Sequence, residues 1–194
     1  MKRISIVGIL LLSVLFTNAQ NPIYYLLVGT YTNTGASEGI YVYRFNPNKT
    51  EVTLMSKTTG VENPSYLTVS KDQKFVYCVN ENTGDKGSVS AFALDKAKGE
   101  LHFLNKQSSG GDAPCFINID ATGKNVIAAN YSGGNFSVFK TNADGTLNPV
   151  VQLIAHQGYG VNVERQEMPH PHAAVFSPDQ KYLFVPDLGN DRLY

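Results

Sequence analysis

The sequence contains no tryptophan, only two cysteines and no excess of charge of either sign. Lysine and arginine together number 16, as do aspartate and glutamate, so the formal net charge at pH 7 is zero. Such a balance produces no overall field that would draw the chain to nucleic acid or to an anionic membrane surface. We therefore expect neither of these as a partner.

The two cysteines, Cys78 and Cys115, both lie in apolar runs that are typical of strands. Two buried free thiols are the simpler interpretation of this pattern. A disulfide between them stays open, because sequence spacing does not tell how far apart two Cα atoms lie in the fold.

Helical periodicity and the common catalytic motifs are also missing. No stretch repeats apolar residues with a helical period for long enough to make a βαβ crossover. Walker and dinucleotide-binding glycine patterns and the G-x-S-x-G elbow are absent. His170 and His172 form a His-x-His pair, but no third metal ligand follows at a diagnostic spacing. We therefore expect neither a metal nor a cofactor.

The first 19 residues have the composition of a cleavable signal peptide. Lys2 and Arg3 precede an apolar run from residue 4 to residue 16, which is too short to span a bilayer. Small residues ending at Ala19 then suggest a cleavage site. We expect an exported, periplasmic or extracellular protein with no membrane contact after cleavage, whose residues 20–194 belong to one domain and act as a monomer.

The strongest signal in the sequence is a repeat of about 50 residues. PSYLTVSKDQKFVYCVNE from Pro64, PCFINIDATGKNVIAANY from Pro114 and PHAAVFSPDQKYLFVPDL from Pro171 align without gaps. Each contains a proline, an apolar strand, a polar turn and a second apolar strand. Third strands are predicted at 87–94 and 135–140, and shorter fourth strands at 100–104 and 147–154.

Antiparallel four-stranded units with this period are typical of β-propeller blades. Residues 24–31, 39–45 and 52–55 supply three strands of one blade without its first strand. The third repeat reaches only its third strand. We therefore predict an all-β propeller fragment with one incomplete blade, two complete blades and about half of another, from the N-terminal part of a longer propeller.

The longest connection between repeats is AHQGYGVNVERQEMPHPH, residues 155–172, which we call the long link. Long loops on a rigid repeat scaffold are common places for binding sites. His172 aligns with Ser65 and Cys115, at the start of an inner strand, where an imidazole could move a proton at neutral pH. The run from Glu164 to Glu167 could bind an anion or orient an imidazole, but a solvated charge cluster is the alternative.

The candidate residues fall into two groups. The catalytic candidates are His172, His170 and Glu164. Asp187 aligns with Asn130 at the end of a second strand, where it either faces the channel or caps a turn. The substrate-binding candidates are Arg165, Gln166, Asp187 and Asn130.

Residues 156–194 resemble the signature region of the seven-bladed propeller lactonases, and the blade pattern from Tyr24 onward fits as well. That family includes the propeller-type 6-phosphogluconolactonases and, more distantly, the 3-carboxy-cis,cis-muconate lactonising enzymes. The resemblance implies seven blades and an active-site histidine at His172. It also implies hydrolysis of a sugar lactone, foremost 6-phosphogluconolactone, as part of glucose metabolism. An unphosphorylated sugar lactone, a muconate-type cycloisomerisation and a non-catalytic binding disc are the alternatives.

Overall fold

The structure is a computed structural model that describes residues 24–194, all of them in strands, turns and loops. The signal peptide predicted over residues 1–19 lies outside the described residues. No helix long and apolar enough to cross a membrane occurs in this part of the chain. The all-β prediction is confirmed, and the order of the strands shows how the blades are built.

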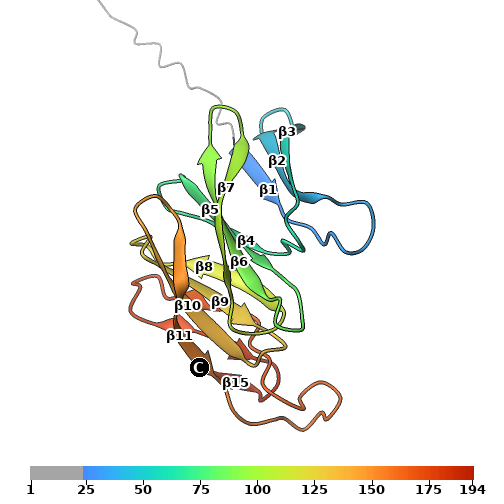
Figure 1. The fold of residues 1–194 in the computed structure, drawn as a ribbon, viewed down its shortest axis with the longest axis vertical. Coiled ribbons are helices and arrows are strands. Elements are labelled where there is room, and N and C mark those ends of the chain that lie inside the picture. The colour runs from blue at the N-terminus through green and yellow to red at the C-terminus, as the bar shows by residue number, and fades with distance from the viewer. Residues whose placement is uncertain (1–23) are drawn as a thin grey trace, which may run out of the picture.

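The first three groups of strands form antiparallel sheets in which sequence neighbours pair (Figure 1). The first sheet consists of β1 (Tyr24–Val28), β2 (Gly39–Asn46) and β3 (Glu51–Thr59). The second consists of β4 (Leu67–Val69), β5 (Phe75–Asn80), β6 (Ser88–Asp95) and β7 (Glu100–Ser108). The third consists of β8 (Pro114–Ile119), β9 (Asn125–Asn130), β10 (Asn135–Thr141) and β11 (Leu147–Ala155).

The remaining strands are short and form two pairs rather than one sheet. They are β12 (Val175–Phe176), β13 (Leu183–Phe184), β14 (Pro186–Asp187) and β15 (Arg192–Leu193). Residues 24–194 thus hold one three-stranded blade, two four-stranded blades and part of a fourth, as the repeat predicted.

The predicted lengths of the outer strands were wrong. They were expected to be shorter than the others, yet β7 and β11 each have nine residues. In β7, the polar residues Lys106 and Gln107 continue to pair with Ser90 and Val89 of β6. An outer strand faces solvent along much of its length, so polar residues can continue its hydrogen bonding beyond the last apolar residue.

The apolar core lies between neighbouring blades rather than inside any one of them. In β5, alternate side chains point to opposite faces, as the pleat of a strand requires. Val76 and Cys78 pack toward the first blade, while Tyr77 and Val79 pack against residues of β8, β9 and β10. Because both faces of β5 are buried, its sequence is a continuous apolar run instead of an alternating one.

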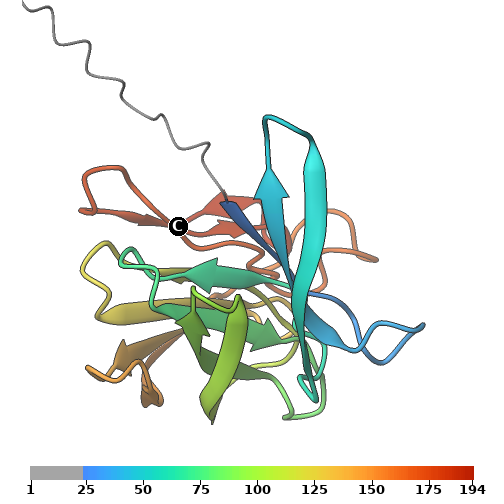
Figure 2. The same cartoon turned by 90° about the horizontal axis from the view of Figure 1, so that it is seen from above.

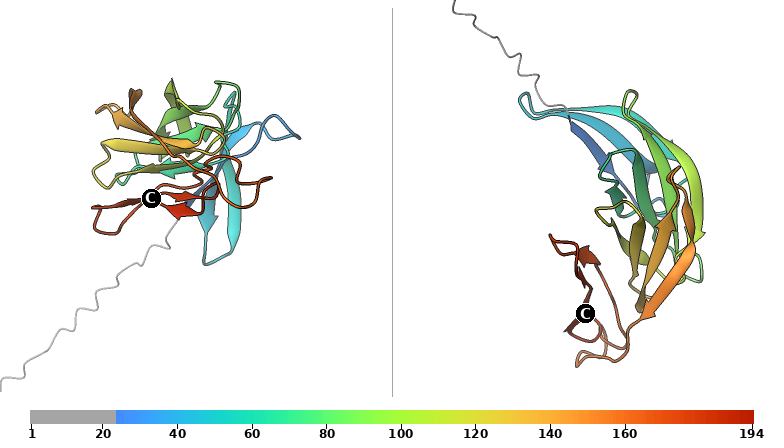
Figure 3. Two further views of the ribbon diagram at one scale, coloured as in Figure 1. Left: turned by 90° about the horizontal axis from the view of Figure 1, so that it is seen from below. Right: turned by 90° about the vertical axis from the view of Figure 1, so that its left-hand side faces the viewer.

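Successive blades follow one another along an arc, most clearly in the right-hand view of Figure 3. The loops 29–38 and 156–170, blue and orange-red, project on the same side in Figures 1 and 2. We call this side the loop-bearing face. Because neighbouring strands run antiparallel, it carries every β-turn between second and third strands and every link between blades. Its segments are 29–38, 60–66, 81–87, 109–113, 131–134, 156–174 and 188–191.

Candidate functional site

Three successive blades repeat one backbone hydrogen bond where the inner strand begins. In each, the residue before the shared proline accepts the amide of the residue that follows the second strand. The acceptor and donor pairs are Asn63 with Glu81, Ala113 with Tyr131, and His170 with Leu188, at 3.0, 2.9 and 3.1 Å. Ser65, Cys115 and His172, which follow the three prolines, therefore occupy equivalent places on the loop-bearing face.

Tyr131 is the centre of a side-chain group that we call the tyrosine cluster. Its ring stacks on His170 with centroids 4.5 Å apart and planes inclined by 15°. His172 meets the same ring edge-on, at 5.5 Å and 82°. The Nη2 group of Arg165 donates a hydrogen bond of 3.3 Å to the phenol oxygen. Three of the predicted residues thus meet around one side chain that the sequence did not single out.

The buried ring of His170 contacts an acceptor through each of its nitrogens. Nδ1 lies 3.0 Å from the carbonyl oxygen of Tyr131, and Nε2 lies 3.2 Å from Oε1 of Glu167. A carbonyl and a carboxylate can only accept, so both contacts are hydrogen bonds only when both ring nitrogens carry a hydrogen. The two contacts therefore hold the ring of His170 in one orientation against Tyr131.

His172 differs from His170 in exposure and in freedom of its ring. Its side chain is open to solvent, and neither ring nitrogen bonds to a residue within 24–194. Its backbone is fixed, because its amide donates to the carbonyl of Pro186 at 3.2 Å. A hollow of about 510 Å³ lies beside it, bordered also by Leu188 and Arg192. When neutral, His172 therefore offers an accessible lone pair on a side chain whose backbone is held in place.

Asp187 holds the end of the long link through three buried contacts. Its Oδ1 accepts the amides of His170 and Gly189 at 2.7 and 2.9 Å, and its Oδ2 lies 2.6 Å from Nδ1 of His156. The residue is only 3% exposed. Of the two orientations that the sequence left open, the carboxylate takes the one that caps the backbone, and it thereby fixes the position of His170.

Gly189 allows the long link to pack directly onto the turn between β14 and β15. A Cβ atom at this position would lie 1.8 Å from the carbonyl oxygen of Met168 and 2.8 Å from the amide nitrogen of His170. No side chain fits into that space, so a glycine is required for the observed approach of the two backbones.

His156 is a site-supporting residue that the sequence analysis missed. It is buried, stacks on Tyr194 with centroids 3.8 Å apart and meets the edge of Phe136. Its Nε2 is buried and bonds to no group between residues 24 and 194. Its partner Asp187 lies 31 positions away in the sequence. No motif spacing predicts such a pair; its position at the start of the long link was the only signal.

Besides Asp187, three more predicted residues lie outside the tyrosine cluster. Gln166 is buried and donates from Nε2 to the carbonyl of Leu188 and to the carboxylate of Asp191, at 2.9 and 2.7 Å. Asn130 is 0% exposed, and its amide group donates to side chains of its own blade. Glu164 is exposed, and its backbone amide forms a local turn. Of the two glutamates in this run, Glu167 and not Glu164 contacts the imidazole of His170.

Both cysteines are free, as the simpler interpretation predicted, but its expectation that both are buried was wrong for Cys115. Cys78 is buried in the core between the first two blades. Cys115 is half-buried on the loop-bearing face, where its Sγ lies 3.8 Å from the carbonyl oxygen of His172. Burial raises the pKa of Cys115 to about 12, and the nearby Glu81 carboxylate adds to this increase. The thiol therefore stays protonated at neutral pH and is a poor nucleophile.

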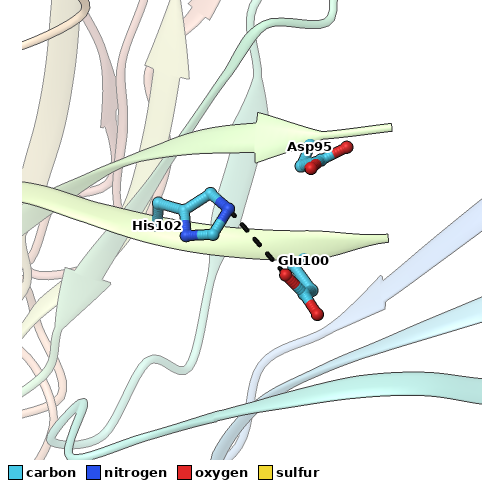
Figure 4. Close-up of side chains that lie close together, drawn as sticks. All are labelled: Asp95, Glu100 and His102. Carbon is cyan, nitrogen blue, oxygen red and sulfur yellow. Dashed lines mark ion pairs between the residues drawn. The ribbon is translucent and has the colours of Figure 1, made fainter. Parts of the chain in front are cut away.

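A separate group of potential metal ligands lies on the opposite face, at the turn between β6 and β7 (Figure 4). It comprises Asp95, Glu100 and His102, and Nε2 of His102 is 3.9 Å from Glu100. Oδ1 of Asp95 already accepts the amides of Ala97 and Lys98 at 2.9 and 3.2 Å. These contacts describe an ordinary charged turn at the surface. His170 and His172 are not part of this group.

The chain is similar to several known proteins in both sequence and structure. The chain is 40% identical over 167 residues to the 6-phosphogluconolactonase of Bacillus subtilis (strain 168), covering 86% of this chain and 47% of that protein. It is 48% identical to the solved structure of a candidate 6-phosphogluconolactonase from Bacteroides fragilis NCTC 9343, with a TM-score of 0.84, covering 88% of this chain and 47% of that one. A periplasmic gluconolactonase structure from Pseudomonas aeruginosa is 39% identical, with a TM-score of 0.82 and coverages of 89% and 49%.

The chain therefore spans about half the length of these relatives. The model of the family described as "Lactonase, 7-bladed beta-propeller" matches residues 25–194, which includes every described blade and the whole tyrosine cluster. The resemblance seen in the long link extends over the complete described fold, and the chain belongs to the seven-bladed β-propeller lactonase family.

Proposed function

We propose that the loop-bearing face carries the active site of a lactonase that opens a sugar lactone to its aldonic acid. The observation that supports this most is the arrangement of the tyrosine cluster. It combines an accessible imidazole, His172, with the guanidinium of Arg165 and the second imidazole, His170, around one aromatic ring. Ester hydrolysis at neutral pH requires a base for water and positive charge for the oxyanion, and both lie together here.

His172 is the general base in this proposal. A water molecule gives a proton to the free nitrogen of His172 and attacks the lactone carbonyl carbon, forming a tetrahedral oxyanion. The bond between that carbon and the ring oxygen then breaks, and the imidazolium of His172 returns the proton to the departing alkoxide. The product is an open hydroxy acid, and no other reactant besides water is consumed.

Arg165 stabilises charge in this proposal, and His170 positions the aromatic ring that the cluster shares. Both ring nitrogens of His170 contact acceptors, so its ring holds one orientation against Tyr131, which His172 also contacts. Arg165 is exposed and has further donors beyond the one that bonds to Tyr131. These donors are available to the oxyanion or to a polar substituent of the lactone.

Two lactones are candidates for the substrate. 6-Phosphogluconolactone is supported by the names of the Bacillus and Bacteroides relatives. Unphosphorylated gluconolactone is supported by the Pseudomonas relative, which is named as periplasmic. It also suits the predicted signal peptide, because an exported enzyme works where phosphorylated sugars are scarce. We propose that the protein acts outside the cytoplasm, as a monomer.

The test is an assay of the full-length protein, without its first 19 residues, on both lactones with correction for spontaneous opening. We expect His172→Ala to lower kcat by about a hundredfold or more, the usual effect of losing a general base. His102→Ala, an exposed histidine on the opposite face, is the matched control and should leave the rate unchanged. If the wild type accelerates neither lactone, the lactonase proposal fails, and cycloisomerisation of a muconate or a binding role would be examined instead.

A further inference from the structure

A second polar group lies on the loop-bearing face, at the junction of the first two blades. The phenol of Tyr31 donates a hydrogen bond of 2.8 Å to Oε2 of Glu81, and the hydroxyl of Ser65 donates to the same oxygen. The other carboxylate oxygen, Oε1, accepts no hydrogen bond from the residues the structure describes. Burial raises the pKa of Tyr31, and the Glu81 carboxylate raises it further. We call these three residues the Glu81 cluster.

The position of the Glu81 cluster is fixed by a buried residue rather than by surface contacts. Asn63 is 3% exposed, and its Oδ1 accepts the amides of Thr32 and Asn33 at 2.9 and 3.1 Å. The hydroxyl of Thr32 in turn accepts the amide of Asn63 at 3.0 Å. This reciprocal contact ties the loop of Tyr31 to the blade that carries Glu81. The cluster is therefore held in place before any ligand arrives.

The Glu81 cluster and the tyrosine cluster belong to one continuous surface. Ser65 and His172 begin equivalent inner strands, and Cys115 begins the strand between them. The thiol of Cys115 is 3.8 Å from the carbonyl of His172 and close enough to Glu81 for that charge to act on it. A ligand whose reacting carbon faces His172 would thus extend across Cys115 toward Glu81.

The chemistry of the Glu81 cluster selects the kind of group that it can bind. The Tyr31 and Ser65 hydroxyls already donate their hydrogens to Glu81, so they can only accept hydrogen bonds from a ligand. Oε1 of Glu81 is a third acceptor. Three acceptors of this kind suit the O–H groups of a polyol. A phosphate or carboxylate would meet negative charge and acceptors only.

We propose that the Glu81 cluster binds the hydroxyl-bearing carbons of the lactone substrate and orients its ring for attack near His172. The inference rests on the lactonase function proposed above and adds the part of the site that recognises the sugar. Arg165, at the other end of the surface, is then the group left to meet any anionic substituent.

Binding can be measured separately from catalysis with D-glucono-1,5-lactam, in which a ring N–H replaces the ring oxygen and resists hydrolysis. In calorimetric titration of the full-length protein, Glu81→Gln should weaken lactam binding at least tenfold, since a hydrogen bond to a charged acceptor is lost. Tyr31→Phe, which leaves the carboxylate in place, should weaken it about threefold. Glu62→Gln, an exposed glutamate on the same face, is the matched control and should bind like the wild type.

Hydrolysis of glucono-1,5-lactone and of δ-valerolactone, which has no hydroxyl groups, provides the second readout. Glu81→Gln should lower kcat/KM at least tenfold for gluconolactone, mainly through KM, and less than twofold for δ-valerolactone. Lactam binding that depends on Glu81 without any lactone hydrolysis would leave the subsite standing and refute the lactonase. Equal effects on both lactones, unchanged lactam binding in Glu81→Gln and Tyr31→Phe, or no lactam binding by the wild type would each overturn the subsite.

Discussion

Replacing Asp187 with alanine should release the long link from the blade that supports it. The carboxylate accepts two buried backbone amides and contacts the imidazole of His156 at 2.6 Å. Alanine leaves all three groups without a partner in a place that water does not reach. His170, whose amide is one of the three, would then lose its fixed position beneath Tyr131.

The expected loss follows from the contacts. Hydrogen bonds to charged groups contribute about 1.5–3 kcal/mol each, and each buried polar group left without a partner costs about 1–3 kcal/mol. Because the contacts share one carboxylate and are not additive, we expect a local loss of about 3–5 kcal/mol. At about 1.4 kcal/mol for each factor of ten, amide exchange in this segment should accelerate roughly 10²- to 10⁴-fold.

Hydrogen–deuterium exchange of the full-length protein measures this directly in peptides that cover residues 166–172 and 186–191. Asp179→Ala is the matched control, because Asp179 also accepts a hydroxyl and a backbone amide, at 2.6 and 3.2 Å, but on an exposed turn. It should change exchange of its own turn only slightly. Exchange in Asp187→Ala within threefold of the wild type would show that the carboxylate does not hold the link, and the reasoning would be refuted.

Three further predictions concern other parts of the fold. Tyr131→Leu should lower kcat/KM for the lactone at least tenfold because it removes the ring between the histidines, whereas Tyr131→Phe, which loses only the Arg165 contact, should stay within threefold. Burial raises the pKa of Tyr77 to about 12, and an unfolded tyrosine titrates near 10, so its contribution to stability is complete below about pH 10 and lost as the pH rises through 12. Urea unfolding across this range should show a smaller decline in Tyr77→Phe. Gly189→Ala should lower the Tm clearly more than Gly123→Ala. Gly123 has a positive φ, but a Cβ added there would meet no atom within 4 Å, whereas one at Gly189 would collide with the backbone of Met168.

The fold could be predicted from the sequence because its information is local and repeated. A proline, two apolar strands and a polar turn return at a fixed spacing, and each feature acts within a few residues of its own position. The outer strands could not be delimited in the same way. Lys106 and Gln107 pair with β6 as fully as their apolar neighbours do, but exposed polar residues carry no pattern that marks a strand.

The site was predicted less completely, because its contacts join distant positions. The sequence directed attention to His170, His172 and Arg165, which the structure brings together. It gave no sign of Tyr131, which is 39 residues from His170, or of His156, which is 31 residues from Asp187. Which of the two glutamates reaches the imidazole of His170 depends on how the long link folds. Gln166 holds this part of the link through hydrogen bonds to Leu188 and Asp191, in the turn between β14 and β15.

The hydrogen bond repeated at the start of each inner strand has a consequence for how such surfaces diversify. Ser65, Cys115 and His172 stand at equivalent places in three blades, so they differ mainly by a rotation about the axis of the propeller. A substitution at one of these positions would add or remove a functional group at one angle around the axis without requiring a change in the backbone. The same side chain at any of these three places would meet a ligand at the channel mouth from a different direction, at the same distance from the axis.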